Sequence, residues 1–320
     1  MGIKFINKFL KNECKHAIRE THLNHLNGKK IAVDINVYIF KYAMEETLIE
    51  NIYMMCSLFR YYNIISIFVF DGSSPAEKKE LLKQRREKKY AAKKEFALLK
   101  NQMTNEDLNS EDKIELQNQM DILKKQFVTI TQDDFAIVKQ LITAYGFETI
   151  DAPREADELC ALLNIKGKVW GVLSEDMDMF VYGCTKVIRY FSILNHKCVV
   201  YDHKMILKTL KINQNELREI CVVSGTDYNI ENKYNLFTIL KLFKKYKNRK
   251  ITENFYNWLS SEIQIDDIDK LNLVFNMFVI NESYKEDEEL ANYDKIKIQI
   301  NSIDKVFIKE LLKKDGFLFP

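Results

Sequence analysis

Three short apolar runs, each closing on an acidic residue, place the strongest constraint on how this chain can fold. They cover residues 31–34, 64–71 and 168–176, and their acids are Asp34, Asp71 and Asp176. Near-continuous apolar runs of this kind are typical of parallel strands that are buried on both faces. Helical patterns alternate with them over roughly 36–62, 132–145 and 155–166. The alternation predicts an α/β layered fold with a central, mostly parallel sheet flanked by helices.

The three acids are expected at one edge of that sheet, because sites in such folds lie at the carboxyl ends of the strands. A single acid at such a position more often ends its strand or caps the next helix. Three acids at equivalent ends, together with Glu155 and Asp157 at the start of a predicted helix, favour a shared site instead.

The chain divides into four predicted regions. These are two halves of the sheet core (1–75 and 131–228), a polar helical insertion (76–130) and a helical C-terminal region (229–320). Within the second half, residues 187–191 and 197–201 flank Asn195 and His196 and predict a β-hairpin. Residues 101–115 are polar and predict an exposed connection within the insertion.

Two segments are rich in basic residues. Between Lys78 and Lys100 ten Lys and Arg residues face three Glu, although 40 Lys against 8 Arg in the whole chain makes any Lys-rich helix less informative. A solvated helix is one interpretation; a phosphate-contacting helix over the sheet edge is favoured, because the segment follows the strand that ends at Asp71. From Lys241 to Lys250 there are six basic residues and no acid, and phosphate contact and simple amphipathicity are equally favoured there.

Composition excludes several classes of protein. The net charge of +2 gives no global cationic field, so attraction to nucleic acid must come from local patches. Six scattered cysteines indicate reduced thiols, and the five histidines have no zinc-ligand spacing. We find no membrane span, signal peptide, P-loop or nucleophile elbow. We therefore expect an intracellular protein, nuclear or cytoplasmic, with no membrane partner.

The acids of residues 155–178 predict the chemistry. The stretch begins with Glu155, Asp157 and Glu158 and ends with Asp176 and Asp178. Carboxylates that crowd near a core need a cation, and Mg²⁺ favours such all-oxygen sites. Two divalent ions about 4 Å apart can clamp the attacking and leaving oxygens of a phosphodiester. Helix geometry leaves open whether Asp157 or Glu158 joins Glu155 in such a site.

Six motifs in order carry a family resemblance. They are Met1-Gly2-Ile3, Ala32-Val33-Asp34, Phe68-Val69-Phe70-Asp71-Gly72, Ala152-Pro153-Arg154-Glu155-Ala156-Asp157, Ser174-Glu175-Asp176-Met177-Asp178 and Ser224-Gly225-Thr226-Asp227-Tyr228. Through them the chain resembles the flap endonuclease / XPG family of structure-specific 5′ nucleases. A weaker match, residues 307–317, resembles the family's late helical segment. The resemblance implies a PIN-like nuclease core, with the polar insertion as a helical arch through which a 5′ single strand passes.

The resemblance also implies roles for individual residues. The metal-site carboxylates would be Asp34, Asp71, Glu155, Asp157, Asp176, Asp178 and Asp227, holding two Mg²⁺ ions for which Mn²⁺ could substitute. It selects Asp157 and leaves Glu158 and Glu175 outside the set. Lys78 and Arg85 would stabilise charge on the scissile phosphate. The candidate DNA contacts are the backbone of Gly2, a stacking Phe40, and Lys79, Lys88, Lys89, Lys244 and Lys245. For Phe40, a place in the core is an alternative.

The chain departs from the family after Asp227. The segment 229–235 is shorter than the family's duplex-gripping turn and has no glycine, so a turn that needs positive φ would have to use Asn. No motif for docking to a sliding clamp is present, and we expect a monomer. The compact length and Lys-rich, Asn-rich composition are typical of an AT-rich genome such as that of a large DNA virus, for which a cytoplasmic replication site would follow.

The leading hypothesis is therefore an Mg²⁺-dependent nuclease that cleaves 5′ flaps or 5′ ends of DNA near a junction of single strand and duplex, in replication, repair or recombination. A 5′→3′ DNA exonuclease acting on nicks or ends is the first alternative. A catalytically inactive DNA-binding scaffold is disfavoured because all seven acids are present. A 5′→3′ exoribonuclease with a related core is a fourth hypothesis.

Overall fold

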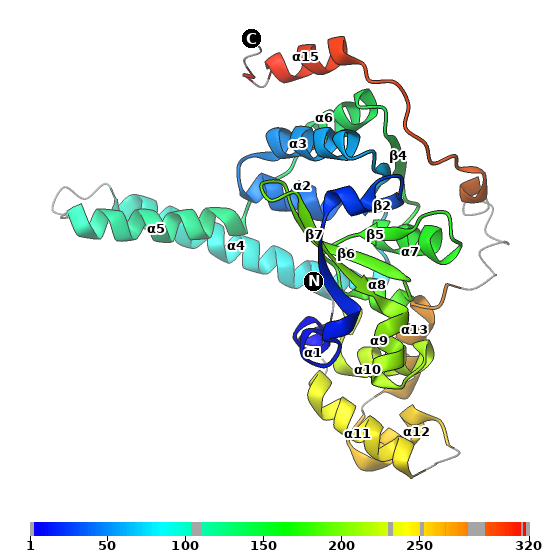
Figure 1. The fold of residues 1–320 in the computed structure, drawn as a ribbon. Coiled ribbons are helices and arrows are strands. Elements are labelled where there is room, and N and C mark those ends of the chain that lie inside the picture. Colours follow the sequence, from blue (N-terminus) through cyan, green and yellow to red (C-terminus); the bar gives the residue numbers. More distant parts are fainter. Residues whose placement is uncertain are drawn as a thin grey trace.

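A computed structural model describes residues 3–103, 110–229, 233–249, 253–265, 267–280, 292–314 and 316–317. Its centre is a seven-stranded sheet with the order β1-β7-β6-β5-β2-β3-β4 (Figure 1). The strands are β1 Ile18–His22, β2 Lys30–Asp34, β3 Ile65–Phe70, β4 Glu148–Asp151, β5 Gly171–Leu173, β6 Lys186–Ser192 and β7 Lys197–Asp202. The five strands from β6 to β4 are parallel, and β7 and β1 continue the sheet antiparallel. The predicted α/β fold with a mostly parallel sheet is confirmed.

Helices cover both faces of the sheet. They are α1 Ile6–Glu13, α2 Ile35–Met44, α3 Leu48–Tyr61, α4 Lys79–Gln102, α5 Ser110–Gln126, α6 Gln132–Ala144, α7 Ala156–Ile165, α8 Asp178–Tyr182, α9 His203–Leu210, α10 Gln214–Ser224, α11 Leu236–Asn248, α12 Phe255–Glu262, α13 Ile268–Met277 and α15 Lys305–Lys314. Short 3₁₀ turns lie at Lys15–Ala17, Leu23–Leu26, Ala76–Lys78 and Asn292–Lys295. Among the described residues, no helix is both long and apolar enough to cross a lipid bilayer.

Alternation along the central strands divides the core into two layers. In β2, Ile31 and Val33 belong to a buried cluster with side chains of α2, α3, α6 and α15, whereas Ala32 belongs to a second cluster. That second cluster lies on the other face of the sheet and includes side chains of α1, α7, α8 and α10 to α13. Successive strand residues point to opposite faces, so a continuous apolar run is what a doubly covered sheet requires.

Some predicted elements need correction. The single helix predicted over 36–62 is wrong, because the chain forms α2 and α3 with a turn between them. Glu46 has a left-handed φ of 58°, and the Glu46 and Thr47 amides donate to carbonyls of the last turn of α2, which ends that helix. Strands β1 and β4 were not predicted. The predicted hairpin is confirmed as β6 and β7. In the predicted connection 101–115, α4 runs to Gln102 and α5 begins at Ser110; the segment 104–109 lies outside the described residues.

Helices α4 and α5 pack against one another and project from the sheet as an arm (Figure 1). The rings of Phe96 and Phe127 meet edge to face, with centroids 5.2 Å apart. The Lys89 ammonium donates a hydrogen bond to the Val128 carbonyl at 2.7 Å. Apart from Ala92, the side chains of α4 are exposed or half-buried, which explains the polar composition of the segment.

Candidate functional site

The three strand-end acids lie at one edge of the sheet. Asp34 is the last residue of β2 and pairs with Val69, two residues before Asp71. On the other side of β2, Val33 pairs with Leu173, three residues before Asp176. Because β2, β3 and β5 are parallel, all three acids emerge at the same carboxyl edge, as the sequence predicts.

Asp71 joins the end of β3 to the start of α7. Its Oδ1 atom accepts a hydrogen bond from the Ala156 amide at 2.8 Å, and its Oδ2 atom accepts one from the Asn36 side chain at 2.6 Å. The next residue, Gly72, passes so close to this segment that a Cβ atom would lie 2.0 Å from the Ala152 carbonyl oxygen. Only glycine fits there, and the close approach brings α7 against the sheet edge.

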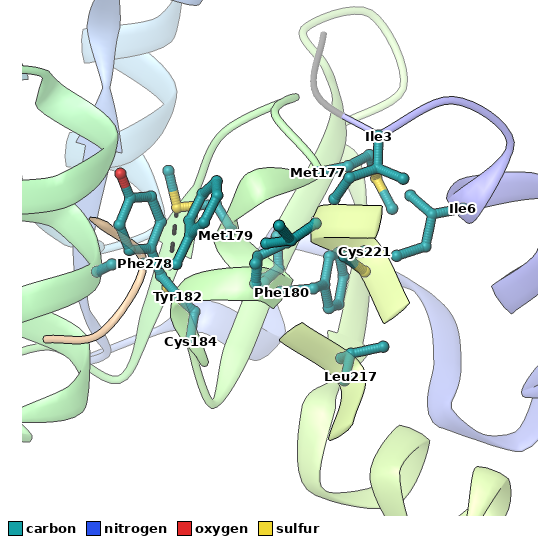
Figure 2. Close-up of a cluster of buried hydrophobic side chains, with 14 of the residues drawn as sticks. Ile3, Ile6, Met177, Met179, Phe180, Tyr182, Cys184, Leu217, Cys221 and Phe278 are labelled. Atoms are coloured by element: carbon teal, nitrogen blue, oxygen red, sulfur yellow. Dashed lines mark hydrogen bonds between the residues drawn. The ribbon is translucent and has the colours of Figure 1, made fainter. Parts of the chain in front are cut away.

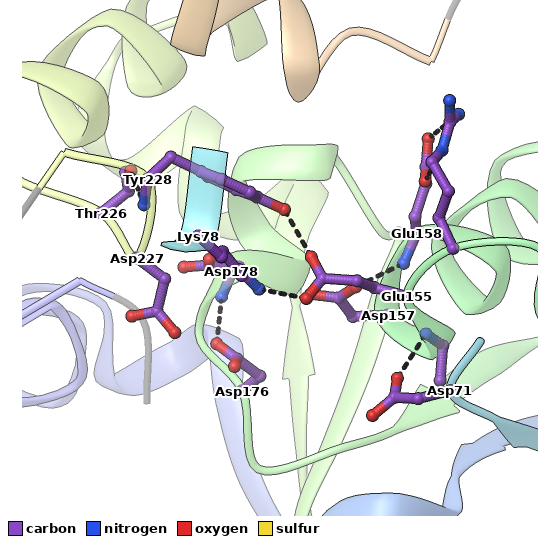
Figure 3. Close-up of polar contacts among 12 residues, drawn as sticks. Asp71, Lys78, Glu155, Asp157, Glu158, Asp176, Asp178, Thr226, Asp227 and Tyr228 are labelled. Atoms are coloured by element: carbon purple, nitrogen blue, oxygen red, sulfur yellow. Dashed lines mark hydrogen bonds and ion pairs between the residues drawn. The ribbon is translucent and has the colours of Figure 1, made fainter. Parts of the chain in front are cut away.

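The first turn of α7 gives Asp157 and Glu158, the two candidates for joining Glu155 in the site, different surroundings. Glu155 is the N-cap residue, and Asp157 is 7% exposed. Glu158 instead accepts two hydrogen bonds from the Arg154 guanidinium, at 2.9 and 2.7 Å, away from the other acids (Figure 3). The structure therefore brings Asp157 to the cluster and turns Glu158 away from it.

The loop after β5 adds Asp176 and Asp178. The Ser174 hydroxyl donates to Asp34 Oδ2 at 2.8 Å and accepts from the Asp176 amide at 3.1 Å. The Asp178 amide then donates to Asp176 Oδ1 at 3.0 Å (Figure 3). Ser174, which sequence reasoning did not select as a site residue, links the acids of two strands; its signal in the sequence is that it opens the motif Ser174-Glu175-Asp176-Met177-Asp178.

Two cations at the base of the arm reach the cluster: Lys78, the last residue of the 3₁₀ turn before α4, and Arg85 of α4. The Lys78 side chain, only 10% exposed, lies 2.7 Å from Glu155 Oε1. The Tyr228 hydroxyl donates to the other oxygen of Glu155 at 2.7 Å, and the Lys78 ammonium lies 4.8 Å from the centre of the Tyr228 ring. Arg85 bonds to Asp227 Oδ2 at 3.0 Å. The start of α4 is thus attached to the cluster at two points; the Tyr228 contact was not predicted.

The acids are in an environment that opposes their charges. Burial, followed by the charge of Asp71, raises the pKa of Asp34 to about 8. Burial also raises the pKa of Asp157 and Asp178, with neighbouring carboxylates adding to the shift. For Lys78, burial lowers the pKa, but Asp157 and Glu155 outweigh it and the net shift is upward. The cluster therefore requires positive charge.

The residues present fit a divalent cation by their chemistry. All the candidate metal-ligand atoms in the cluster are carboxylate oxygens. Among them, Asp178 Oδ1 is buried without a hydrogen-bond partner. Among the described residues, however, no three His, Cys, Asp or Glu side chains are already arranged around one point as ligands. Lys78 and Arg85 occupy oxygens of Glu155 and Asp227, so side chains must rotate before all seven acids could serve as ligands.

Comparison with known proteins identifies the family. The profile described as the XPG N-terminal domain matches residues 1–92, and the XPG I-region profile matches residues 146–227. Together they cover more than half of the chain and contain all seven selected acids, with Asp227 as the last matched residue. The chain belongs to the XPG/FEN1 family of structure-specific nucleases.

Relatives agree with this assignment. The chain is 27% identical over 310 residues to the probable RAD2-like endonuclease 369L of Invertebrate iridescent virus 6, an alignment that covers 81% of this chain and 74% of the relative. It is 29% identical over 250 residues to flap endonuclease 1 of Leishmania major, covering 71% and 60%. The matched region thus spans less than two thirds of that flap endonuclease.

Solved structures show the same fold. The catalytic core of Rad2 in complex with DNA substrate has a TM-score of 0.69 at 21% identity, with 99% of this chain and 96% of that chain covered. Flap endonuclease-1 from Methanococcus jannaschii has a TM-score of 0.63 at 19% identity, with 98% and 93% covered. Human GEN1 in complex with Holliday junction DNA has a TM-score of 0.64 at 17% identity, with 99% and 74% covered.

The predicted DNA contacts of this XPG-family chain differ in their surroundings. Phe40 is 50% exposed on α2, so the alternative that it belongs to the core is wrong. Lys79, Lys88 and Lys244 are exposed. Lys89, in contrast, donates a hydrogen bond to the Val128 carbonyl, and Lys245 forms an ion pair with Glu262. Gly2 lies outside the described residues.

Hydrogen bonds of the Asn229 side chain hold the turn around Asp227 in place. The Oδ1 atom of Asn229 accepts from the Thr226 amide at 2.8 Å and hydroxyl at 2.6 Å, and its amide group donates to the Val222 carbonyl at 2.7 Å. Positive φ falls on Gly225, before Asp227, and on no described residue of 229–235; residues 230–232 lie outside the described residues. Asn235 then caps α11.

Proposed function

We propose that this chain is an Mg²⁺-dependent structure-specific 5′ nuclease that hydrolyses DNA phosphodiesters near junctions of single strand and duplex. The observation that carries the proposal is the convergence of carboxylates at the ends of β2, β3 and β5 and the starts of α7 and α8 on one sheet edge. Four of these carboxylates are buried, and Lys78 and Arg85, at the start of α4, pair with two of the candidate acids. Membership of the XPG family supports it, as do the DNA complexes solved for Rad2 and GEN1. The biological process it serves would be DNA replication, repair or recombination.

The carboxylates would hold the metal. The candidate ligands are Asp34, Asp71, Glu155, Asp157, Asp176, Asp178 and Asp227. Bound divalent ions supply the positive charge that eases ionisation of a water molecule and neutralises the departing oxygen of a phosphodiester. Neighbouring groups fix the ligands: Ser174 orients Asp34, Asn36 and the Ala156 amide orient Asp71, and Tyr228 orients Glu155.

Lys78 and Arg85 would act on the phosphate. Both bring positive charge to the cluster, Lys78 from just before α4 and Arg85 from within it, and in the described structure both are paired with candidate metal ligands. Released from those carboxylates, they would stabilise negative charge that develops on phosphoryl oxygens. The arm formed by α4 and α5 would then be the helical arch that receives a 5′ single strand, and exposed Phe40 would stack on a base near the cleavage point.

A panel of labelled substrates tests the proposal. The full chain is incubated with 5′-flap, nicked, blunt and single-stranded DNA and with 5′-monophosphate RNA, in Mg²⁺ or in EDTA, beside Asp176→Ala. We expect Mg²⁺-dependent cleavage of flap DNA that Asp176→Ala loses. Cleavage of nicks and ends without flaps would indicate the exonuclease, and a preference for RNA the exoribonuclease. Absence of any Mg²⁺-dependent cleavage, or full activity in Asp176→Ala, would reject the nuclease assignment.

A further inference from the structure

Away from the carboxylate cluster, α1 and α11 lie beside one another (Figure 1), and exposed aromatic rings at the starts of these two helices contact each other. Phe5, the N-cap residue of α1, is 55% exposed, and Phe237 in the first turn of α11 is 41% exposed. Their ring centroids lie 6.2 Å apart, and half-buried Phe9 meets the Phe237 ring edge to face at 6.4 Å. Two partly exposed rings from sequence-distant elements therefore lie together at one place on the surface.

The backbone at Phe5 is in a conformation that phenylalanine rarely adopts. Its φ of 67° lies in the left-handed region, where a side chain crowds the backbone and glycine is favoured. Strain of this kind is found where surrounding structure holds a residue in place for a function. The chain keeps a large apolar ring exposed at a position where glycine would be more stable.

Lysines lie near these rings in the sequence, with Lys8 three residues after Phe5 and Lys241 four residues after Phe237. Lys4, Lys8 and Lys241 are exposed, and within the part of the chain that the structure describes none of them has an acidic partner within 4 Å. Lys241 follows Phe237 by four residues, so both lie on the same face of α11. Aromatic faces among unpaired cations suit nucleobases joined by phosphates; a protein partner with an apolar interface has no need of this excess of positive charge.

Both helices are firmly attached to the catalytic side of the molecule. Ile3 and Ile6 of the N-terminal segment belong to the same buried cluster as Met177, which stands between Asp176 and Asp178 (Figure 2). Leu236 and Ile239 of α11 belong to that cluster too. The exposed rings therefore have a fixed position relative to the loop that carries two candidate metal ligands.

We propose that Phe5 and Phe237, with Lys8 and Lys241, form a stacking surface for unpaired nucleotides of the DNA substrate. This surface is separate from Phe40 and the arm, and the inference rests on the proposed function because it assigns the same substrate a second point of contact. Rings would stack on bases without regard to their identity, and the lysines would contact the phosphates between them.

Binding measurements on the full-length protein test the surface. All variants are made in the cleavage-deficient Asp176→Ala protein, and DNA binding is measured by fluorescence anisotropy. Two test probes carry a ten-nucleotide unpaired tail at one or the other end of the labelled strand of a duplex. The control probes are the blunt duplex and a duplex whose tail is made of abasic nucleotides. We expect Phe5→Leu with Phe237→Leu to weaken binding to one tailed duplex about tenfold, because stacking on a base is worth about that factor. The blunt and abasic probes should change less than about twofold.

Further variants separate stacking from folding and from charge. Phe5→Gly should leave the thermal midpoint no lower than that of the parent protein while still losing affinity for the tailed duplex, since glycine relieves the left-handed strain. Lys8→Gln and Lys241→Gln should each lower the slope of log affinity against log salt by about one, with the ring variants leaving it unchanged. Phe307→Leu and Lys305→Gln on α15 are matched controls, exposed at the opposite end of the molecule (Figure 1).

The inference is overturned if the double Phe variant binds every probe like its parent, or loses affinity for blunt and tailed duplexes alike. The proposed function is tested apart from it, by Mg²⁺-dependent cleavage in protein with Asp176 intact. Active protein with unaltered binding in the Phe variants rejects the stacking surface alone. Inactive protein rejects the nuclease.

Discussion

The carboxylate cluster and the α4–α5 arm are built in opposite ways, although both are assigned to the same reaction. In the cluster, four of the seven acids are buried, and backbone amides and short side chains fix them, as the Ala156 amide and Asn36 fix the more exposed Asp71. In the arm, the 24-residue helix α4 buries a single side chain, Ala92, and touches the cluster through Arg85 and through Lys78, the buried residue just before it.

The two constructions suit two different requirements: the cluster must hold its side chains in precise positions, and the arm must be able to adjust its position. Metal ligands must be placed within fractions of an ångström, and rigid strand ends and a helix start provide that. An element that receives a flexible strand needs room to adjust, and a helix pair with little buried surface provides it. Substitutions in the cluster should therefore change stability and catalysis together, whereas those in the arm should change catalysis and leave core stability nearly intact.

The largest expected effect is at Asp178. Asp178→Asn should slow cleavage roughly 1,000-fold or more, comparable to the strongest losses of a single charge-stabilising group. In EDTA the same variant should melt at a higher temperature than the parent, because burial and the charge of Asp176 raise the pKa of Asp178 and one of its oxygens has no partner. Single-turnover cleavage and thermal melting measure the two effects.

Glu158→Gln is the matched control for Asp178→Asn. Its partner is Arg154, outside the cluster, so cleavage should stay within about threefold of the parent, as expected for a surface ion pair worth less than 1 kcal/mol. A Glu158 variant as slow as the Asp178 variant would contradict the assignment of ligands. An Asp178 variant less stable in EDTA would show that repulsion does not dominate the cluster.

Lys78 and Arg85 come next in expected size, and they distinguish the two regions within one helix. Alanine at either position should slow single-turnover cleavage about 100-fold while weakening DNA binding much less. Only Lys78→Ala should lower the thermal midpoint in EDTA, because it leaves Glu155 and Asp157 without their buried cation. Arg85 is 47% exposed and should leave the midpoint unchanged.

Exposed Lys79 provides the comparison for both variants. Lys79→Ala should affect neither the midpoint nor the chemical step, and should weaken binding slightly if it contacts phosphate. If Arg85→Ala destabilised the protein as much as Lys78→Ala, the arm and the cluster would be one structural unit. If binding alone fell in either variant, the assigned action on the transition state would be wrong.

The pH dependence of stability should reveal the cluster and not the arm. The folded protein raises the pKa of Asp34 from an ordinary 3.8 to about 8, so it favours the protonated form. The resulting stabilisation is complete below about pH 4 and is lost as pH rises toward 8. In EDTA the thermal midpoint should fall between pH 6 and 8.5, and Asp34→Asn should reduce that fall.

Mg²⁺ should reverse this trend. A ligand that binds only the folded state stabilises it by about 2.7 kcal/mol at 100 times its dissociation constant, and carboxylates must be ionised to bind it. The rise in midpoint on adding Mg²⁺ should therefore be larger at pH 8.5 than at pH 6. An equal rise at both pH values, or one retained in Asp178→Asn, would place the ion elsewhere.

The same contrast explains what could be predicted from sequence. The position of Asp34, Asp71 and Asp176 at one edge of the sheet can be predicted from the buried parallel strands alone. The apolar run before each acid predicts both the strand and the residue at which that strand ends. The choice of Asp157 over Glu158 does not, because it depends on how α7 is turned, which the Asp71–Ala156 hydrogen bond determines across 85 positions. Resemblance to the XPG family supplied that choice; in the structure Asp157 lies beside the other acids, whereas Glu158 pairs with Arg154.

Other features depend on contacts that no local pattern encodes. Strand β4 has only four residues, three of them half-buried and one exposed, so it lacks the apolar run that marked β2 and β3. The pairing of Lys78 with Glu155 joins residues 77 positions apart, and it exists because the arm begins beside the first turn of α7. The break at Glu46 rests on a left-handed residue that carries no glycine signal.

The smallest expected effect lies within the arm. Phe96→Ala removes the edge-to-face contact with Phe127, and such pairs are worth about 0.5–1.5 kcal/mol. Amide hydrogen exchange in α4 and α5 should accelerate by up to about tenfold, while exchange in β2 and β3 stays as it was. Tyr90→Ala, at a 73% exposed position of the same helix, should change neither.

Cleavage of flap DNA by Phe96→Ala should fall only a few-fold, because the carboxylates and the cations at the base of α4 remain in place. Faster exchange in the sheet strands would mean that the arm stabilises the core, against the separation argued from Ala92 and the polar face of α4. Unchanged exchange everywhere would mean that α4 and α5 are held by the Lys89–Val128 hydrogen bond and backbone contacts instead of the aromatic pair. In both cases the arm would be a stiffer element than its exposure suggests, and a 5′ strand would have to enter a preformed opening.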